Sequence, residues 1–191
     1  MNLNPLSRSL AVGALALMAA LPALSQQKLL PEQSEIAFVA RQMGVPLDGR
    51  FRKFDAQISF DVAKPQASKI AFTVDVGSAT LGSRETDAEL PKAPWFNVPK
   101  FPQATFQSSS VKSLGGGKFE VAGQLTIKGN TRDVVLPVAL TQSGAVTTAT
   151  GTLPLKRLAF KIGENEWADT SMVADDVLVK FKLTLTGMAP L

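Results

Sequence analysis

The sequence predicts an all-β domain of about eight long antiparallel strands, closed as a barrel or packed as a sandwich. Apolar and polar residues alternate with a period of two through most of the chain, which is typical of half-buried strands. Short turn sequences separate these segments, and no βαβ spacing indicates a parallel sheet. The 191 residues, 45% of them hydrophobic, suit a single domain with its own core.

The clearest strand pair covers residues 117–140 and turns at Gly129-Asn130. Before the turn, one face carries Phe119, Val121, Gly123, Leu125 and Ile127. The other face is polar and ends at Lys128. After the turn, one face is again apolar, with Val134, Leu136, Val138 and Leu140. A long hairpin with one apolar face is unstable alone, so we expect it to curl round a core or pack on a second sheet.

Six further segments alternate in the same way and are predicted as strands: Ser34–Gln42, Gly49–Phe60, Ser68–Val76, Ala104–Leu114, Ala145–Leu155 and Asp176–Gly187. Phe51 and Phe54 are out of phase within the second of these, which predicts a bulge or bend near Asp55. Pro137 has no N–H to donate, so it predicts a bulge or a locally unpaired side. The inward face mixes bulky residues with small ones such as Gly123, which is compatible with a cavity or a filled core.

Two excursions interrupt the strands. Ser83–Lys92 is predicted as a helix of about two turns, with Ser83 as its N-cap and Pro91 as its stop. A proline-rich stretch, 94–102, follows it, and Lys156–Thr170 forms the second excursion. The large aromatic residues of these excursions should not be left in water, so we interpret them as a structural plug or as a lid over an apolar ligand: Trp95, Phe96, Phe160 and Trp167.

The first 25 residues have the organisation of a secretory signal peptide. A charged start precedes the uncharged run Leu10–Leu24, and the small-x-small pattern Ala23-Leu24-Ser25 ends it. A membrane anchor is the alternative, but the run is shorter than the ~20 apolar residues of a span and is broken by Pro22. No cysteine follows the expected cleavage point, which argues against a lipoprotein. We expect cleavage after Ser25 and a periplasmic or secreted domain at 26–191.

The composition favours binding over catalysis. The chain has no cysteine and no histidine, which removes thiol nucleophiles and the commonest general base and metal ligand, and it has no tyrosine. A Ser–Lys pair within Ser108–Lys112 lacks any strained-turn motif around its serine. The acids around Glu164 lack the ligand spacing of a calcium loop. The basic residues are scattered rather than gathered in a stripe, which argues against nucleic-acid binding. We therefore predict no catalytic residue and no metal site.

Several short motifs together resemble a known family. They are Gly49-x-Phe51-x-x-Phe54, the Asp87–Leu90 segment with Trp95-Phe96-Asn97-Val98-x-x-Phe101-Pro102-x-Ala104-x-Phe106, Gly123-x-Leu125-Thr126-Ile127-x-Gly129-x-Thr131, Arg157-Leu158-Ala159-Phe160-x-Ile162-Gly163, Glu166-Trp167 and the final Val177–Leu185 strand. In this order, over essentially the whole mature chain, they resemble the YceI family of polyisoprenoid-binding, lipocalin-like periplasmic proteins. The forms Trp95-Phe96 and Glu166-Trp167 resemble the branch found beside cytochrome b561-type membrane proteins.

The resemblance implies an extended eight-stranded antiparallel lipocalin-like barrel that holds a long amphiphilic lipid, such as a polyisoprenoid, an isoprenoid quinone or a fatty acid or amide. It implies no enzyme activity and no other cofactor. The residues expected to face this ligand are Phe38, Phe72, Val74, Trp95, Phe96, Phe119, Val121, Leu125, Leu136 and Phe181. Many members carry Arg where this chain has Thr86, so we expect Arg84, with Asp87, to contact the headgroup.

Two other functions remain open at this point. One is an accessory interaction protein for a cytochrome b561-type membrane protein, with any quinone bound incidentally. The other is a structural barrel with a filled core and no ligand.

Overall fold

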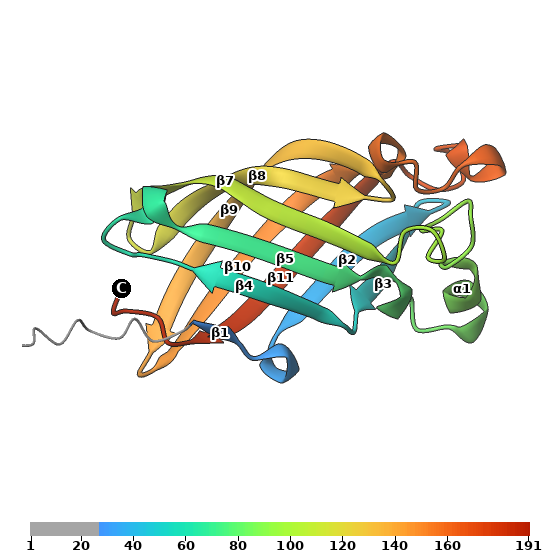
Figure 1. Ribbon diagram of the computed structural model, residues 1–191. Helices are drawn as coiled ribbons and strands as arrows, with labels where there is room; N and C mark the ends of the chain where they lie inside the picture. Colours follow the sequence, from blue (N-terminus) through green and yellow to red (C-terminus); the bar gives the residue numbers. More distant parts are fainter. Residues whose placement is uncertain (1–26) are drawn as a thin grey trace, which may run out of the picture.

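The structure, a computed structural model, describes residues 27–191. The signal peptide expected at residues 1–25 lies outside the described residues. The described chain forms one curled antiparallel sheet of 11 strands (Figure 1). Its strands are β1 (Lys28–Leu29), β2 (Glu35–Gln42), β3 (Val45–Phe51), β4 (Phe54–Ser59), β5 (Lys69–Asp75), β6 (Ala79–Thr80), β7 (Gln103–Gly115), β8 (Lys118–Ile127), β9 (Asn130–Ser143), β10 (Val146–Lys156) and β11 (Asp176–Thr186).

The strand order shows how the sheet curls. It runs β4-β5-β7-β8-β9-β10-β11-β2-β3-β6, so the first long strand pairs with the last, and β1 pairs with β11 beside this path. At one end of β4, the Lys53 N–H donates to the hydroxyl oxygen of Ser78, directly before β6, at 3.0 Å. At the other end, the side-chain amide of Gln27 donates to the Phe60 carbonyl at 2.6 Å and accepts from the Phe60 N–H at 2.7 Å. The two edges of the sheet are thereby held together.

The predicted all-β barrel is confirmed, but it has 11 strands rather than about eight. The segment Gly49–Phe60 was expected to be one strand but forms two, because the chain leaves the sheet at Arg52-Lys53. Phe51 is the cross-strand partner of Ala79 on β6, whereas Phe54 is the cross-strand partner of Val74 on β5. The two-residue break resets the alternation, so both phenylalanines can pack inside. The expected bend near Asp55 therefore lies earlier in the chain, and two strands of two residues, β1 and β6, add to the count.

The other irregular positions follow the chemistry of the backbone. The β9–β10 ladder ends at Val138 opposite Gly151, so Pro137 has a pairing partner only on the β8 side, as its missing N–H predicts. The register of β7 against β8 shifts between Ser108 and Ser110, a bulge that the alternation did not indicate.

The excursions gather at one end of the barrel, on the right in Figure 1, and form what we call the cap. The cap contains the helix α1 (Arg84–Glu89) and the short 3-10 helices η4 (Arg157–Phe160) and η5 (Asn165–Ala168). Three further 3-10 helices connect strands: η1 (Pro31–Gln33), η2 (Pro65–Ala67) and η3 (Val76–Ser78). Ser83 occupies the N-cap position of α1, but its side chain makes no capping hydrogen bond, contrary to the expectation. Within residues 27–191, no helix has both the length and the hydropathy to cross a bilayer.

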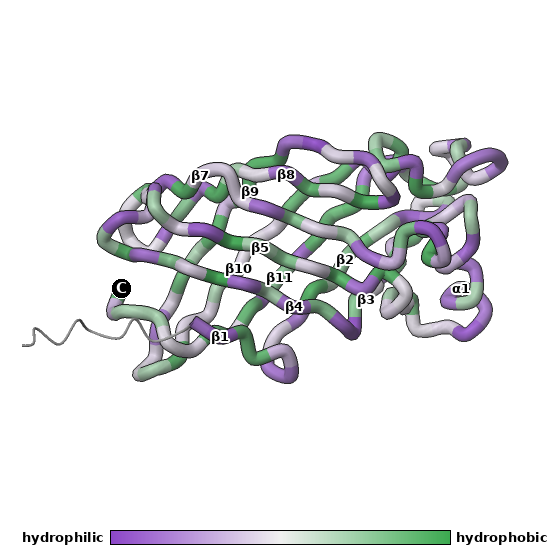
Figure 2. Tube along the Cα trace, in the orientation of Figure 1, coloured by the Kyte–Doolittle hydropathy of each residue, from purple (hydrophilic) through white to green (hydrophobic). Residues whose placement is uncertain are grey.

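The alternation read from the sequence becomes an apolar interior. In Figure 2, hydrophobic and hydrophilic residues alternate along the strands. The buried residues form two core clusters, one inside the barrel and one beneath the cap. Phe51, Val74 and Leu125 pack against both clusters, so they mark the boundary between them.

Candidate ligand-binding site

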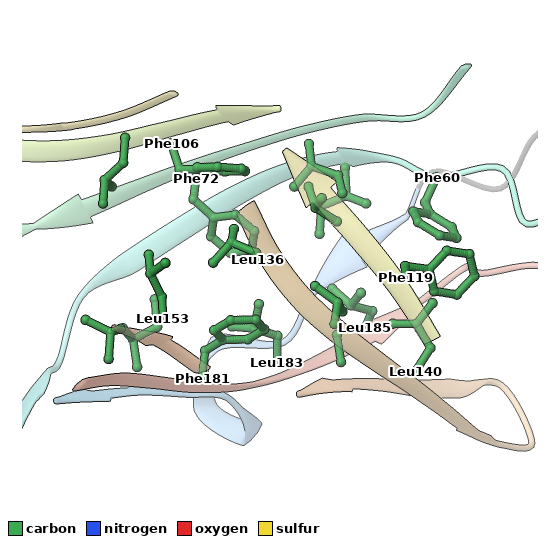
Figure 3. A pocket seen from close by; sticks show the side chains of 18 of the residues that line it. Phe60, Phe72, Phe106, Phe119, Leu136, Leu140, Leu153, Phe181, Leu183 and Leu185 are labelled. Carbon is green, nitrogen blue, oxygen red and sulfur yellow. The ribbon is translucent and has the colours of Figure 1, made fainter. Parts of the chain in front are cut away.

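The barrel encloses a wholly apolar cavity of about 170 Å³, which we call the barrel cavity (Figure 3). Its lining comes from most of the strands and from Met188 near the C-terminus, and every lining residue is hydrophobic. One water needs only ~10–15 Å³ measured in this way, so the space is much larger than a packing defect. At the end away from the cap, the rings of Phe60 and Phe119 meet edge to face at 5.1 Å. The barrel cavity can therefore hold a sizeable apolar chain.

A second cavity of about 200 Å³, the cap cavity, lies between the barrel and the excursions. Val179 lines both cavities, so they adjoin each other. The polar side chains of the cap cavity include Gln42, Thr86, Glu89 and Arg157. Both cavities are mainly apolar, and only the cap cavity has polar side chains on its wall.

Glycines on the inward face keep aromatic rings against the wall. The ring tips of Phe38, Phe106 and Phe181 occupy the space where a Cβ atom would stand on Gly49, Gly123 and Gly151. Phe38 and Gly49 are direct cross-strand partners, as are Phe181 and Gly151. Each ring covers the gap that the glycine leaves, which resembles aromatic rescue of glycine in other sheets.

All ten residues expected to face a ligand line one of the two cavities. Seven line the barrel cavity: Phe72, Val74, Phe119, Val121, Leu125, Leu136 and Phe181. Three line the cap cavity: Phe38, Trp95 and Phe96. Phe72, Val74 and Phe181 are only partly buried although they point inward, because the interior is not filled by side chains. Whether these residues bind a ligand stays a prediction.

The structure places the expected headgroup residues elsewhere. Neither Arg84 nor Asp87 is among the residues that line the two cavities, whereas Thr86 and Glu89 of the same helix do line the cap cavity. The Asp87 carboxylate accepts from the Thr80 hydroxyl and from the Leu81 N–H, both at 2.6 Å. The Thr80 hydrogen bond is the main cause of its lowered pKa. Asp87 thus fixes α1 to the sheet.

Lys128 holds the two excursions together, a role that its place on the polar face of its strand did not predict. The left-handed backbone of Lys128 breaks the alternation at the turn, and the residue is only 7% exposed. Its Nζ donates to the carbonyls of Ala93 at 2.8 Å and Lys161 at 2.7 Å, and to the Glu164 carboxylate at 2.7 Å. The hydrogen bond from Lys128 lowers the pKa of Glu164.

Arg157 is a second buried cation, 3% exposed, on the wall of the cap cavity. Its guanidinium donates to five backbone carbonyls of the loop that follows, those of Ile162, Gly163, Trp167, Val173 and Ala174, at 2.6–3.1 Å. Burial lowers its pKa. The resemblance alone had brought this arginine to attention, as the start of a motif.

The indole N–H of Trp95 is an unsatisfied donor in the cap. The ring packs on Trp167 at a centroid distance of 5.4 Å, and both residues line the cap cavity. Trp95 Nε1 is buried and has no hydrogen-bond acceptor within the described chain. Thr147 Oγ1 of β10 is likewise buried without a hydrogen-bond partner there. A buried donor without a partner costs about 1–3 kcal/mol, so an acceptor at this position would be stabilising.

Comparisons with known proteins agree with this geometry. The profile of the YceI-like domain matches residues 28–185. A UPF0312 protein of Azotobacter vinelandii is 37% identical over 132 residues, which are 67% of this chain and 68% of that protein. Protein YceI of Salmonella arizonae is 40% identical over 98 residues, 51% of each chain.

Solved structures show the same fold. The crystal structure of Burkholderia cenocepacia BcnA superposes with a TM-score of 0.80 at 43% identity, covering 82% of this chain and 99% of that one. A polyisoprenoid-binding domain from Saccharophagus degradans, implicated in plant cell wall breakdown, superposes with a TM-score of 0.66 at 16% identity, covering 86% of this chain and 99% of that one. At that identity the second likeness speaks for the fold alone.

Proposed function

The chain belongs to the family of proteins with a YceI-like domain, and from this premise we propose that it binds a long-chain amphiphilic lipid without acting on it chemically. The ligand class is a polyisoprenoid, an isoprenoid quinone or a fatty acid or amide. The Saccharophagus degradans domain with the same fold is a polyisoprenoid-binding domain, which supports this choice.

The observation that carries the proposal is the wholly apolar barrel cavity of about 170 Å³. Each CH₂ group moved from water into such a site contributes about 0.8 kcal/mol of favourable transfer free energy. The binding free energy of an apolar tail therefore grows with the number of CH₂ groups buried. None of the lining residues of this cavity can transfer a proton or attack a bond. A binding role therefore fits this site better than catalysis.

We also propose a direction for the ligand. We place the tail in the barrel cavity and the polar end in the cap cavity, because polar side chains line only the latter. There, Trp95 Nε1 offers a buried donor, and Arg157 contributes a positive charge. This orientation favours a headgroup with hydrogen-bond acceptors, such as a quinone carbonyl or a carboxylate.

Intrinsic fluorescence tests the proposal directly. The chain has two tryptophans, Trp95 and Trp167, and both line the cap cavity. A titrated isoprenoid quinone should quench them. Leu125→Trp would fill part of the barrel cavity but would add a third tryptophan that obscures the signal. The variant to compare is therefore Leu136→Ala, which enlarges the cavity without adding a fluorophore. Native mass spectrometry of protein gently extracted from its own cells should show a co-purifying lipid. Absence of both quenching and a bound lipid would refute the proposal.

The setting of this function is part of the proposal. The sequence of residues 1–25 supports export, so we place the carrier in the periplasm or outside the cell, where an apolar lipid cannot cross water unaided. A carrier with this cavity would supply that passage.

An accessory role beside a cytochrome b561-type membrane protein is the second candidate. It is supported by Trp95-Phe96 and Glu166-Trp167, two sequences that the cap brings together. Affinity purification from membranes should then recover a haem-containing protein with the wild-type chain and less of it with Trp167→Ala. Recovery that does not depend on the cap would speak against this role.

A further inference from the structure

An exposed apolar tip projects at the cap end of the molecule. Met43 and Val45, at the β2–β3 turn, are 69% and 61% exposed, and Met172 of the loop after η5 is 41% exposed. The Met43 N–H donates to the Met172 carbonyl at 2.8 Å, and the Ala174 N–H donates to the Arg41 carbonyl at 2.9 Å. These bonds hold the hairpin and the loop as one unit, so the three side chains form a single surface, which we call the apolar tip.

The apolar tip continues the lining of the cap cavity. Val45 pairs with Gln42 across the hairpin, and cross-strand partners lie on the same face of a sheet. Leu47, two residues further along β3, shares that face as well. Gln42, Leu47 and Val173 line the cap cavity, and Val173 forms a bridge with Gln42. The inward face of the hairpin thus runs past the barrel rim and ends in solvent at Val45.

We propose that the apolar tip docks the protein onto a lipid bilayer, and that lipid enters the cap cavity from that bilayer. The cargo part of this inference rests on the proposed function, whereas the docking part does not. Side chains of Met and Val at a projecting turn can enter the boundary between headgroups and acyl chains. The cavity face beside them then offers lipid a route that avoids water.

The size and charge of the surface favour a bilayer over a protein partner. A stable protein complex buries about 800 Å² on each partner, which three partly exposed side chains do not supply. The first charged residue behind the turn is the exposed cation Arg41, which suits lipid phosphate. Of the acids of the adjoining loop, Asp169 accepts from Ser171 and Asp175 accepts from the Leu158 N–H, whereas Glu166 is exposed.

Vesicle flotation tests docking. The mature protein is mixed with vesicles of phosphatidylethanolamine and phosphatidylglycerol, without added cargo. The tip variant combines Met43→Asn with Val45→Thr, because Asn tolerates the left-handed backbone of residue 43 and Thr preserves the shape of Val. The matched control combines Leu114→Gln with Val135→Thr, which change two residues that are 51% and 56% exposed on β7 and β9.

We expect the tip variant to lose about ten-fold in its vesicle partition coefficient and the control to stay near wild type. Equal binding by the wild-type protein and the tip variant, or no binding by the wild-type protein, would overturn the docking proposal. So would a change of sedimentation with the tip variant, since the surface would then join copies of this chain.

A second measurement separates docking from cargo binding. In buffer without vesicles, the tip variant should bind a short-chain isoprenoid quinone as the wild-type protein does, by tryptophan quenching. Loading of a long-chain quinone from donor vesicles should slow about ten-fold, in step with the lost partitioning. Normal loading by a variant that no longer docks would overturn the entry route. Lack of quinone binding by the wild-type protein would instead count against the proposed function and leave the flotation result intact.

Discussion

The ring tip of Phe181 on β11 stands where a Cβ atom of Gly151 on β10 would be. The two residues are direct cross-strand partners, and the carbonyl of Pro137 approaches the same point from β9. Residue 151 must therefore be glycine for steric reasons. The space left by the missing side chain determines where the Phe181 ring lies. The same relationship joins Phe38 to Gly49. The shape of the interior depends on these pairs as well as on the bulk of its aromatic residues.

Gly151→Ala should destabilise the protein by about 1–3 kcal/mol, because the added methyl group meets both a ring and a backbone oxygen. Denaturant unfolding measures the loss. Thr150→Ala, at the neighbouring exposed position, serves as the control and should change stability little. Combining Gly151→Ala with Phe181→Leu should recover part of the loss. Additive effects of the two changes would show that the ring and the glycine are not coupled.

Phe72→Trp should add bulk to the barrel cavity rather than to a filled core. Phe72 lines this cavity and is only partly buried, so we expect the melting temperature to change little and the retained lipid to fall. Thermal unfolding and lipid extraction of the same preparation measure the two effects. In a filled core the same change would cost about 1–3 kcal/mol. Such a loss in protein that never holds lipid would favour the structural barrel.

Lys128→Met should loosen the cap, because it leaves the carbonyls of Ala93 and Lys161 without their shared donor. Each unsatisfied buried group costs about 1–3 kcal/mol, and water entering the cap will reduce that loss. We expect faster proteolysis within residues 91–102 and 156–175. The exposed Lys182→Met is the matched control. Equal proteolysis in the two variants would contradict the role assigned to Lys128.

Glu164 should make stability depend on acid pH. Its pKa lies below the ordinary value of 4.5, mainly because of the Lys128 hydrogen bond. A lowered folded-state pKa stabilises the protein above pH 4.5, and this contribution disappears as the pH falls through the lowered pKa. The carboxylate is 43% exposed, so the gain should stay below about 1 kcal/mol. Unfolding of wild type and Glu164→Gln should differ at neutral pH and converge in acid. A constant difference across this range would exclude the carboxylate as its source.

Export should remove residues 1–25. The pattern Ala23-Leu24-Ser25 predicts cleavage after Ser25, so the exported protein should begin at Gln26. N-terminal sequencing of the exported protein checks this, and Ser25→Arg should slow processing. An exported chain that still begins at Met1 would show that this segment is retained.

The sequence by itself determined most of the long strands and the side of each that faces inward. A period of two is a local property, so Phe119, Val121 and Leu125 were placed together before any pairing was known. The resemblance to the YceI family likewise rested on short local sequence motifs. The sequence also predicted that Trp95 and Phe96 would be covered, since large apolar residues outside the strands should not be left in water, and both line the cap cavity.

Only the tertiary structure decided which positions depart from the local pattern. Lys128 belongs to a polar face by alternation, yet its ammonium is buried because carbonyls from two distant excursions converge on it. Asp87 was expected at a headgroup, but Thr80 and Leu81 already occupy its oxygens. The cavity itself is the volume left when the strands close, and its size depends on the curl of the sheet and on pairs such as Phe181 and Gly151. These are distances between residues far apart in the chain, which alternation along a single strand does not specify.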